Sequence, residues 1–190
     1  MIVLGIDPGI NGGFAVYDSA ERELRWAQAI PTHETSEGKC VDVARFWEDI
    51  RDSASWAKMV FVEKVNGRLP RGPGGKVFGS AGPALFNFGY AVGQIHMTLA
   101  NFGFSPVLLE PQEWQAGLRV PVGKRGSVIC ADRLFPGKKQ LWRGPKGGLH
   151  HDIAEAALIA KYGAESRWAE EYQRQQRELR PTTPAATGSS

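Results

Sequence analysis

The chain has 190 residues and a net charge of +3, with 42% hydrophobic and 23% charged residues, a composition typical of a globular domain with a substantial core. It contains no run of about 18 apolar residues, no basic segment before its first apolar stretch, and only two cysteines, Cys40 and Cys130. We therefore expect no membrane span, no secretory signal and no disulfide framework, as in a protein of the reducing cytoplasm.

The sequence of the first third of the chain predicts four strands and one helix. Short apolar runs separated by tight Gly- and Asp-containing connections predict an antiparallel meander of strands at residues 2–6, 14–17 and 23–30. Apolar residues with helical spacing predict a helix over residues 41–57. A strand at residues 59–63 follows this helix, so we expect it to lie parallel to the first strand.

The remainder predicts a fifth strand and three helices separated by two long loops. Residues 64–83 contain six glycines and three prolines and are expected to form a loop. The elements expected after it are a helix from Pro83 to about residue 102, a strand at 105–109, a helix at about 125–134, a loop at 136–149, and a helix that starts near His151 and continues through the polar stretch 165–180. From Pro181 onward the composition predicts disorder.

The positive charge is concentrated in the two loop regions. Residues 64–83 and 123–149 together hold 11 of the 23 basic residues and one of the 20 acidic residues. This segregation predicts a face that binds a polyanion such as nucleic acid. The alternative interpretation is a pair of solvated glycine-rich loops that are basic by chance.

Four acidic residues occupy positions flanked by residues expected to be buried. Asp7 ends the first strand, Glu63 ends the fourth, and Asp152 and Glu155 lie three residues apart on one face of the last helix. Buried carboxylates are costly without partners. If the four converge, a hard divalent cation such as Mg²⁺ or Mn²⁺ would offset their repulsion. This pattern is typical of a metal-dependent phosphoryl-transfer site.

Each acid also has a structural interpretation when taken alone. Asp7 precedes Pro-Gly, where aspartate often shapes a turn, and Glu63 could be an ion-paired strand end. Asp152 and Glu155 could interact favourably with the macrodipole at the start of their helix. The metal-site hypothesis depends on the four residues together.

The order β-β-β-α-β-α-β-α, with acids on the first strand, the fourth strand and the last helix, is similar to the ribonuclease H-like fold, an α/β fold with a five-stranded mixed sheet flanked by helices. The chain resembles RuvC-type Holliday junction resolvases, in particular those carried by bacteriophages. The resemblance covers about residues 2–162. Its motifs are Gly5-Ile-Asp7-Pro-Gly9, Val62-Glu63, Pro111-Gln-Glu-Trp114, Gly123-Lys124-Arg-Gly-Ser127, Leu134-Phe-Pro136 and Asp152-Ile-Ala-Glu155-Ala-Ala-Leu-Ile-Ala160. We assign residues 1–165 to this domain and residues 166–190 to a polar helical extension and a disordered tail.

The resemblance implies a crossover junction endodeoxyribonuclease that cleaves Holliday junctions or branched DNA by two-metal phosphodiester hydrolysis, leaving 5′-phosphate and 3′-hydroxyl ends. It implies catalytic and metal-binding roles for Asp7, Glu63, Asp152 and Glu155, with two Mg²⁺ per site and Mn²⁺ as a substitute. The family usually has a second aspartate at the position of Glu155, so the carboxylate here reaches further by one methylene. His151 is a further candidate ligand, although a helix-cap or solvated role is the simpler interpretation.

The resemblance also indicates which basic residues contact DNA. Lys124 matches a family lysine near the scissile phosphate and is assigned a catalytic role, with simple backbone contact as the alternative. The expected DNA-binding residues are Arg68, Arg71, Lys76, Lys124, Arg125, Lys138, Lys139, Arg143 and Lys146.

Family members act as homodimers, and the expected helix starting at Pro83, with Phe86, Phe88 and Tyr90, is the candidate interface. Cellular relatives place a junction-opening aromatic residue where this chain has Asn66, so Leu69 or Phe78 would have to take that role. We expect a cytoplasmic location, in the host cell if the protein is phage-encoded.

Three other interpretations remain open. An actin-like ATPase or sugar kinase shares the Gly-Ile-Asp-x-Gly pattern, but such folds need two large lobes. A non-catalytic DNA-binding module is disfavoured, because acids that face phosphates weaken binding unless a metal intervenes. A broader structure-selective nuclease, or one acting on RNA–DNA hybrids, is compatible with the same residues.

Overall fold

The computed structural model describes residues 1–36, 38–65, 81–123 and 125–178. Its main sheet has five strands in the order β3-β2-β1-β6-β7. These are β1 (Ile2–Asp7), β2 (Gly13–Asp18), β3 (Glu23–Ala29), β6 (Ala57–Glu63) and β7 (Val107–Leu109). The first three strands pair antiparallel, and β6 runs parallel to both β1 and β7. The predicted meander, the parallel fourth strand and the mixed five-stranded sheet are all confirmed.

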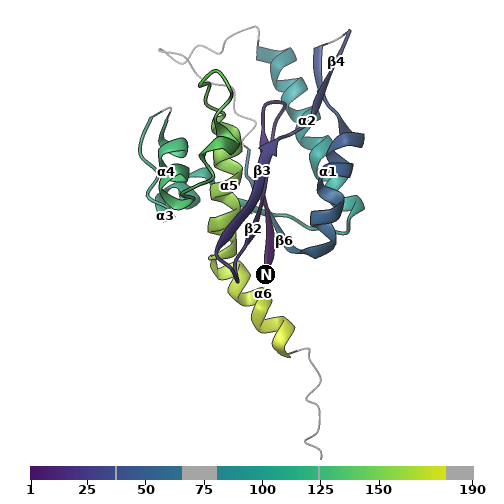
Figure 1. The fold of residues 1–190 in the computed structure, drawn as a ribbon. Helices are drawn as coiled ribbons and strands as arrows, with labels where there is room; N and C mark the ends of the chain where they lie inside the picture. The colour runs from purple at the N-terminus through teal and green to yellow at the C-terminus, as the bar shows by residue number, and fades with distance from the viewer. Residues whose placement is uncertain (37, 66–80, 124, 179–190) are drawn as a thin grey trace, which may run out of the picture.

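Helices cover both faces of this sheet (Figure 1). One face carries α1 (Val43–Trp56) and α2 (Ala81–Asn101), and the other carries α5 (His151–Ala164). Beyond α5 lie α3 (Pro111–Gly117) and α4 (Gly126–Leu134), and the short 3₁₀ helix η2 (Lys139–Trp142) contacts both α5 and β3. The final helix, α6 (Arg167–Glu178), extends away from the sheet. This arrangement is the predicted α/β architecture.

Helix α5 packs unusually close to strands β1 and β2. A Cβ atom on Gly5 would lie 2.2 Å from the Ala160 backbone nitrogen, and one on Gly13 would lie 2.6 Å from the Asp152 carbonyl oxygen. The buried face of α5 is built largely from alanines, which lets the two backbones approach. The start of α5 is therefore fixed against the end of β1, where Asp7 lies.

The opposite face of the sheet is packed with larger side chains. Phe14 contacts the rings of Trp26 and Phe46 edge-on, and Ile95 and Leu99 of α2 complete this half of the core. Part of α2 remains uncovered, because Phe86 is 72% exposed, Tyr90 54% and Met97 64%. The interior of the sheet is thus sealed on both faces, while one helix keeps apolar side chains in solvent.

Three elements differ from the sequence-based expectation. Strands β4 (Thr32–Thr35) and β5 (Gly38–Val41) pair antiparallel, and half of their residues are exposed, so they show no apolar alternation. Helix α3 follows β7 directly, with Pro111 at its first turn. The last helix does not continue unbroken, since α5 ends at Ala164 and α6 begins after Ser166, whose backbone carbonyl accepts a hydrogen bond from the Ala169 amide.

No helix among the described residues is long and apolar enough to cross a membrane. The disordered tail expected from Pro181 lies outside the described residues. The division into a domain at 1–165 and an extension at 166–190 stays a prediction.

Candidate metal centre

The sheet brings two of the four acids to one edge. Asp7 is the last residue of β1 and Glu63 the last residue of β6, and the parallel register pairs Ile6 with Val62. Carboxyl ends of adjacent parallel strands meet at the same edge, so Asp7 and Glu63 are neighbours there. Asp7 is 9% exposed.

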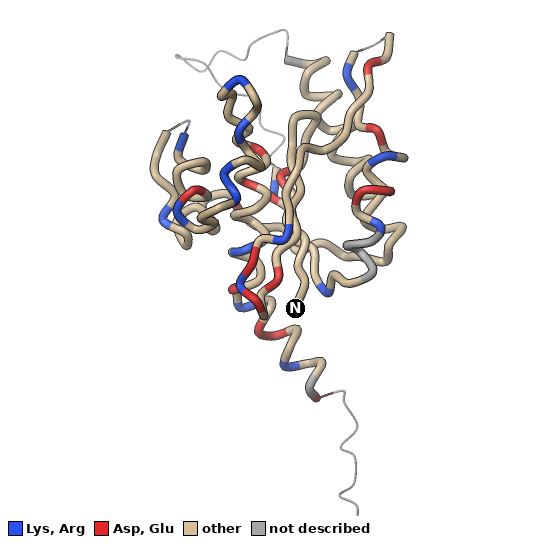
Figure 2. Tube along the Cα trace, viewed as in Figure 1, with Lys and Arg blue, Asp and Glu red and all other residues tan. Residues whose placement is uncertain are grey.

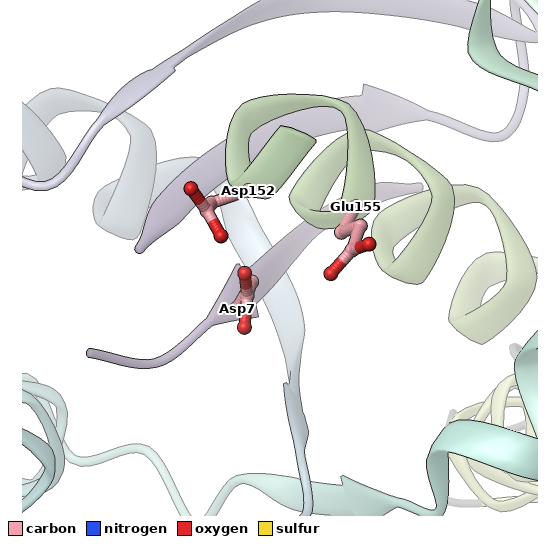
Figure 3. A group of neighbouring side chains, drawn as sticks. All are labelled: Asp7, Asp152 and Glu155. Atoms are coloured by element: carbon pink, nitrogen blue, oxygen red, sulfur yellow. The ribbon is translucent and has the colours of Figure 1, made fainter. Parts of the chain in front are cut away.

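The close packing of α5 adds the other two acids. Asp152 lies in the first turn of α5 and Glu155 follows three residues later. Asp7, Asp152 and Glu155 each offer a carboxylate oxygen, and these atoms lie within 4.8 Å of one another. Figure 3 shows the three carboxyl groups pointing toward one another. The structure thus places together three of the four predicted metal ligands.

Glu63 lies beside this group, outside the set whose oxygens share the 4.8 Å limit. Its Oε2 accepts a hydrogen bond from Nε1 of the fully buried Trp114, at 2.9 Å. Its charge still acts on Asp7, whose pKa it helps to raise. Glu63 is therefore at the edge of the cluster and held by a side chain of α3.

Burial and mutual repulsion shift the acids toward their protonated forms. Burial raises the pKa of Asp7 well above its usual value, and the charges of Glu63, Glu155 and Asp152 add to the effect. Burial also raises the pKa of Glu63 to about 7, although the hydrogen bond from Trp114 opposes the change. For Glu155, burial raises the pKa, the Ser127 hydrogen bond lowers it, and the charge of Asp152 raises it.

The donor set fits a hard divalent cation. All three clustered side chains offer carboxylate oxygens, the type of donor that Mg²⁺ and Mn²⁺ prefer. Within the described residues, no lysine or arginine forms an ion pair with Asp7, Glu63, Asp152 or Glu155. A buried or partly buried group of like charges with no basic partner is stabilised when a cation binds among them.

His151 lies at the first position of α5, next to Asp152, and is partly buried. Its Nδ1 atom is buried and has no hydrogen-bond partner among the described residues, and its charge acts to lower the pKa of Glu155. His151 remains a candidate ligand, as the sequence suggested.

The basic residues that follow α4 line the long connection to α5, where Figure 2 shows several lysines and arginines. Two of them already have acidic partners: Lys138 pairs with Glu23 at 3.2 Å, and Arg143 pairs with Asp132. Arg125, Lys139 and Lys146 are exposed, and no ion pair involves them within the described part of the chain. The predicted residues Arg68, Arg71, Lys76 and Lys124 lie outside the described residues, as do Asn66, Leu69 and Phe78.

Two residues at the site were not identified from the sequence. Trp114 donates to Glu63, and the Ser127 hydroxyl donates to Glu155 Oε1 at 2.6 Å. Both belong to motifs that carry the family resemblance, but the hydrogen bonds span 51 and 28 residues of sequence. Pro111 could have indicated the start of α3, because proline is favoured at the first position of a helix. A helix that starts there would carry Trp114 one turn later.

The fold is that of the ribonuclease H-like class. No protein-family model matches the chain, and no curated protein matches it significantly. Among solved structures, RuvC of T. thermophilus in complex with a Holliday junction substrate is similar, with a TM-score of 0.56 and 17% sequence identity over 89% of this chain and 96% of that chain. A second structure of Thermus thermophilus RuvC has a TM-score of 0.46 and 18% identity, over 87% of this chain and 96% of that chain. At this identity the likeness concerns the fold, so the chain has a RuvC-like arrangement of sheet and helices.

Proposed function

We propose that the protein is a metal-dependent endonuclease that cleaves Holliday junctions or other branched DNA and leaves 5′-phosphate and 3′-hydroxyl ends. The observation that carries the proposal is the group of Asp7, Asp152 and Glu155 at the edge of a RuvC-like sheet, in which Asp7 is buried and the other two are partly buried, with Glu63 beside it. Support for the substrate comes from the similar fold of the T. thermophilus protein, which was solved with a Holliday junction. The proposed nuclease domain is residues 1–165.

Asp7, Glu63, Asp152 and Glu155 would hold two Mg²⁺ ions, with Mn²⁺ as a substitute. When bound, such ions supply activation of water and stabilisation of negative charge for phosphodiester hydrolysis. Asp7 is central because it is the most buried of the four and because the charges of the other three raise its pKa. Since its pKa is raised, protons compete with a cation for the cluster, which couples metal affinity to pH.

The chain's basic residues would hold the DNA backbone. Arg125 presents an exposed charge directly before α4, and Lys139 and Lys146 present exposed charges in the connection that leads to α5. Lys138 and Arg143 would exchange Glu23 and Asp132 for phosphates, so their net contribution is smaller. Roles for Lys124 near the scissile phosphate, and for Arg68, Arg71 and Lys76, remain part of the proposal.

A homodimer would present two such sites to opposed strands of a junction. The exposed face of α2 is our proposed interface, where the rings of Phe86 and Tyr90 stack at 6.4 Å and Met97 continues the apolar surface. Phe88 is less exposed, and its ring lies near Gly9. The free cysteines Cys40 and Cys130 suit our proposed cytoplasmic location, in a host cell if the protein is phage-encoded.

The test is cleavage of a labelled four-way junction in Mg²⁺ and in Mn²⁺, with duplex, flap, fork and RNA–DNA hybrid controls. We expect paired symmetric nicks that disappear in Asp7→Asn while junction binding persists. Equal cleavage of flaps and forks would replace the junction resolvase with a broader branched-DNA nuclease, and preference for the hybrid with an RNA–DNA hybrid nuclease. Binding without cleavage in either metal would leave a DNA-binding module.

A further inference from the structure

The two glutamates of the site are each held by an uncharged donor from outside the sheet and α5. Trp114 Nε1 donates to Glu63 Oε2 at 2.9 Å, and Ser127 Oγ donates to Glu155 Oε1 at 2.6 Å. Trp114 is fully buried and Ser127 is 7% exposed. Both donors are therefore shielded parts of the structure and not surface contacts.

The helices that carry these donors are fixed to the rest of the protein. The backbone nitrogen of Lys64 donates to the Leu109 carbonyl at 2.8 Å, and the Lys64 ammonium pairs with Glu110, the residue before α3. On α4, Gly126 packs so tightly that an added Cβ would lie 1.8 Å from the Pro121 carbonyl oxygen. The end of β6 is thus tied to α3, and the start of α4 has little room to move.

The chemistry of the donors suits the task of orienting a ligand. Glutamate has one more rotatable bond than aspartate, so its carboxylate needs more restraint to stay in one place. A hydrogen bond to one oxygen supplies that restraint and leaves the second oxygen for a cation. An indole N–H or a hydroxyl adds no charge, whereas lysine or arginine would compete with the cation for the carboxylate.

We propose that Trp114 and Ser127 are positioning residues that hold Glu63 and Glu155 in the geometry needed to bind a divalent cation. This inference rests on the proposed function, because it assigns the two glutamates as ligands. Neither donor touches the reacting atoms. Donors of this kind typically change metal affinity or activity by about 10- to 100-fold.

The experiment measures Mn²⁺ binding to the DNA-free protein by isothermal titration calorimetry. The variants are Trp114→Phe, which removes the N–H and keeps an aromatic ring, and Ser127→Ala. We expect each to weaken Mn²⁺ binding by about 10-fold or more. Trp142→Phe is the matched control: Trp142 is also fully buried, and its Nε1 donates at the same 2.9 Å to Asp132 Oδ1, which is not one of the four acids of the site. It should bind Mn²⁺ within about twofold of the wild type if only the donors to the glutamates matter.

A second measurement separates positioning from general destabilisation. In junction cleavage, the Mn²⁺ concentration for half-maximal rate should rise in Trp114→Phe and Ser127→Ala, while KM for the junction stays at the wild-type value. If Trp114→Phe does not fold, Ser127→Ala on a different helix tests the proposal by itself.

The outcomes distinguish failure of the positioning role from failure of the proposed function. Wild-type Mn²⁺ affinity in both donor variants, together with loss of binding in Asp7→Asn, would overturn the positioning role and leave the proposed function intact. Equal Mn²⁺ binding by wild type and Asp7→Asn would overturn the metal site itself. A rise in junction KM with an unchanged metal requirement would also contradict positioning, since it would mean that the donors act on DNA binding.

Discussion

The two faces of the central sheet are packed according to different rules. On the α5 face, Gly5 and Gly13 bring the helix backbone into direct contact with the strands, and the carboxylates lie at the end of that contact. On the α1 and α2 face, large rings such as Phe14 and Phe46 separate the layers, and Tyr90 and Met97 remain exposed. The tightly packed face fixes the distances between the carboxylates, whereas the loosely covered face leaves apolar side chains exposed.

The largest effect is expected when one methyl group is added at Gly5, on the α5 face of the sheet. Gly5→Ala places a Cβ atom 2.2 Å from the Ala160 backbone nitrogen. Because the backbone must move, we expect the free energy of unfolding to fall by about 3 kcal/mol or more. Gly89→Ala is the control on α2, where an added Cβ has no neighbour within 4 Å among the described residues, and helix propensity should raise stability by about 0.5–1 kcal/mol. Urea denaturation would check both, and equal effects would remove the contrast between the faces.

The second prediction concerns the pH dependence of the α5 face without metal. Asp7, Glu63 and Glu155 have raised pKa values in the folded state, that of Glu63 reaching about 7. The folded state therefore binds protons that the unfolded state has released. Stability should be greatest below the unfolded pKa values, near pH 4, and fall as pH rises through 7. Each raised group contributes up to about 1.4 kcal/mol per pH unit.

Thermal unfolding in EDTA between pH 5.5 and 8.5 measures this effect. The Tm of the wild type should fall toward high pH by more than that of Asp7→Asn, and Mg²⁺ should raise the wild-type Tm most at pH 8.5. Identical pH dependence of Tm in the two proteins would show that repulsion among these carboxylates does not control the stability of the folded state.

The third prediction tests the use of the α2 face as an interface. Tyr90→Ala removes an exposed ring that stacks on Phe86. We expect this substitution to raise the dissociation constant of the proposed dimer by about 10-fold, which corresponds to a loss of about 1.4 kcal/mol of binding free energy. Trp56→Ala is the control, since Trp56 is 72% exposed at the end of α1. Sedimentation analysis over a concentration series would detect the change, and a dimer weakened equally by both variants, or by neither, would place the contact elsewhere.

The smallest effect is expected from single lysines in the connection between α4 and α5. Lys139→Gln and Lys146→Gln should each weaken junction binding by a few fold and reduce the salt dependence of log K by about 1. Lys58, exposed near the start of β6 and hence at the opposite edge of the sheet from Glu63, provides the control variant Lys58→Gln. Fluorescence anisotropy at several salt concentrations would measure the slopes. An equal change in Lys58→Gln would mean that net charge alone, and not a local face, governs binding.

Much of this arrangement could be predicted from the sequence because its signals are local. The apolar runs that end in Asp7 and Glu63 define strands, and the helix between them predicts that those strands run parallel with both acids at one edge. The spacing of Asp152 and Glu155 predicts a shared helix face, and three of the four acids do converge.

What the sequence did not predict depends on long-range geometry or on weak local patterns. Half of the residues of β4 and β5 are exposed, so no alternation of apolar residues marks these strands. The contact from Trp114 to Glu63 joins residues 51 positions apart, and a buried tryptophan is normally interpreted as core packing. The sequence also did not show which basic residues are already paired. Lys138 forms an ion pair with Glu23, which is far from it in sequence.

Helix α5 has a practical consequence for attaching probes. It carries the acids at its beginning and leads into α6 at its end, and 14 residues of helix span about 21 Å. A dye or surface linker joined to an exposed residue of α6, such as Gln175→Cys, would be held well away from the carboxylates. Of the two native thiols, Cys130 is buried and only Cys40 is partly accessible, so a Cys40→Ser background would direct maleimide chemistry to the chosen position and allow single molecules to be watched on DNA.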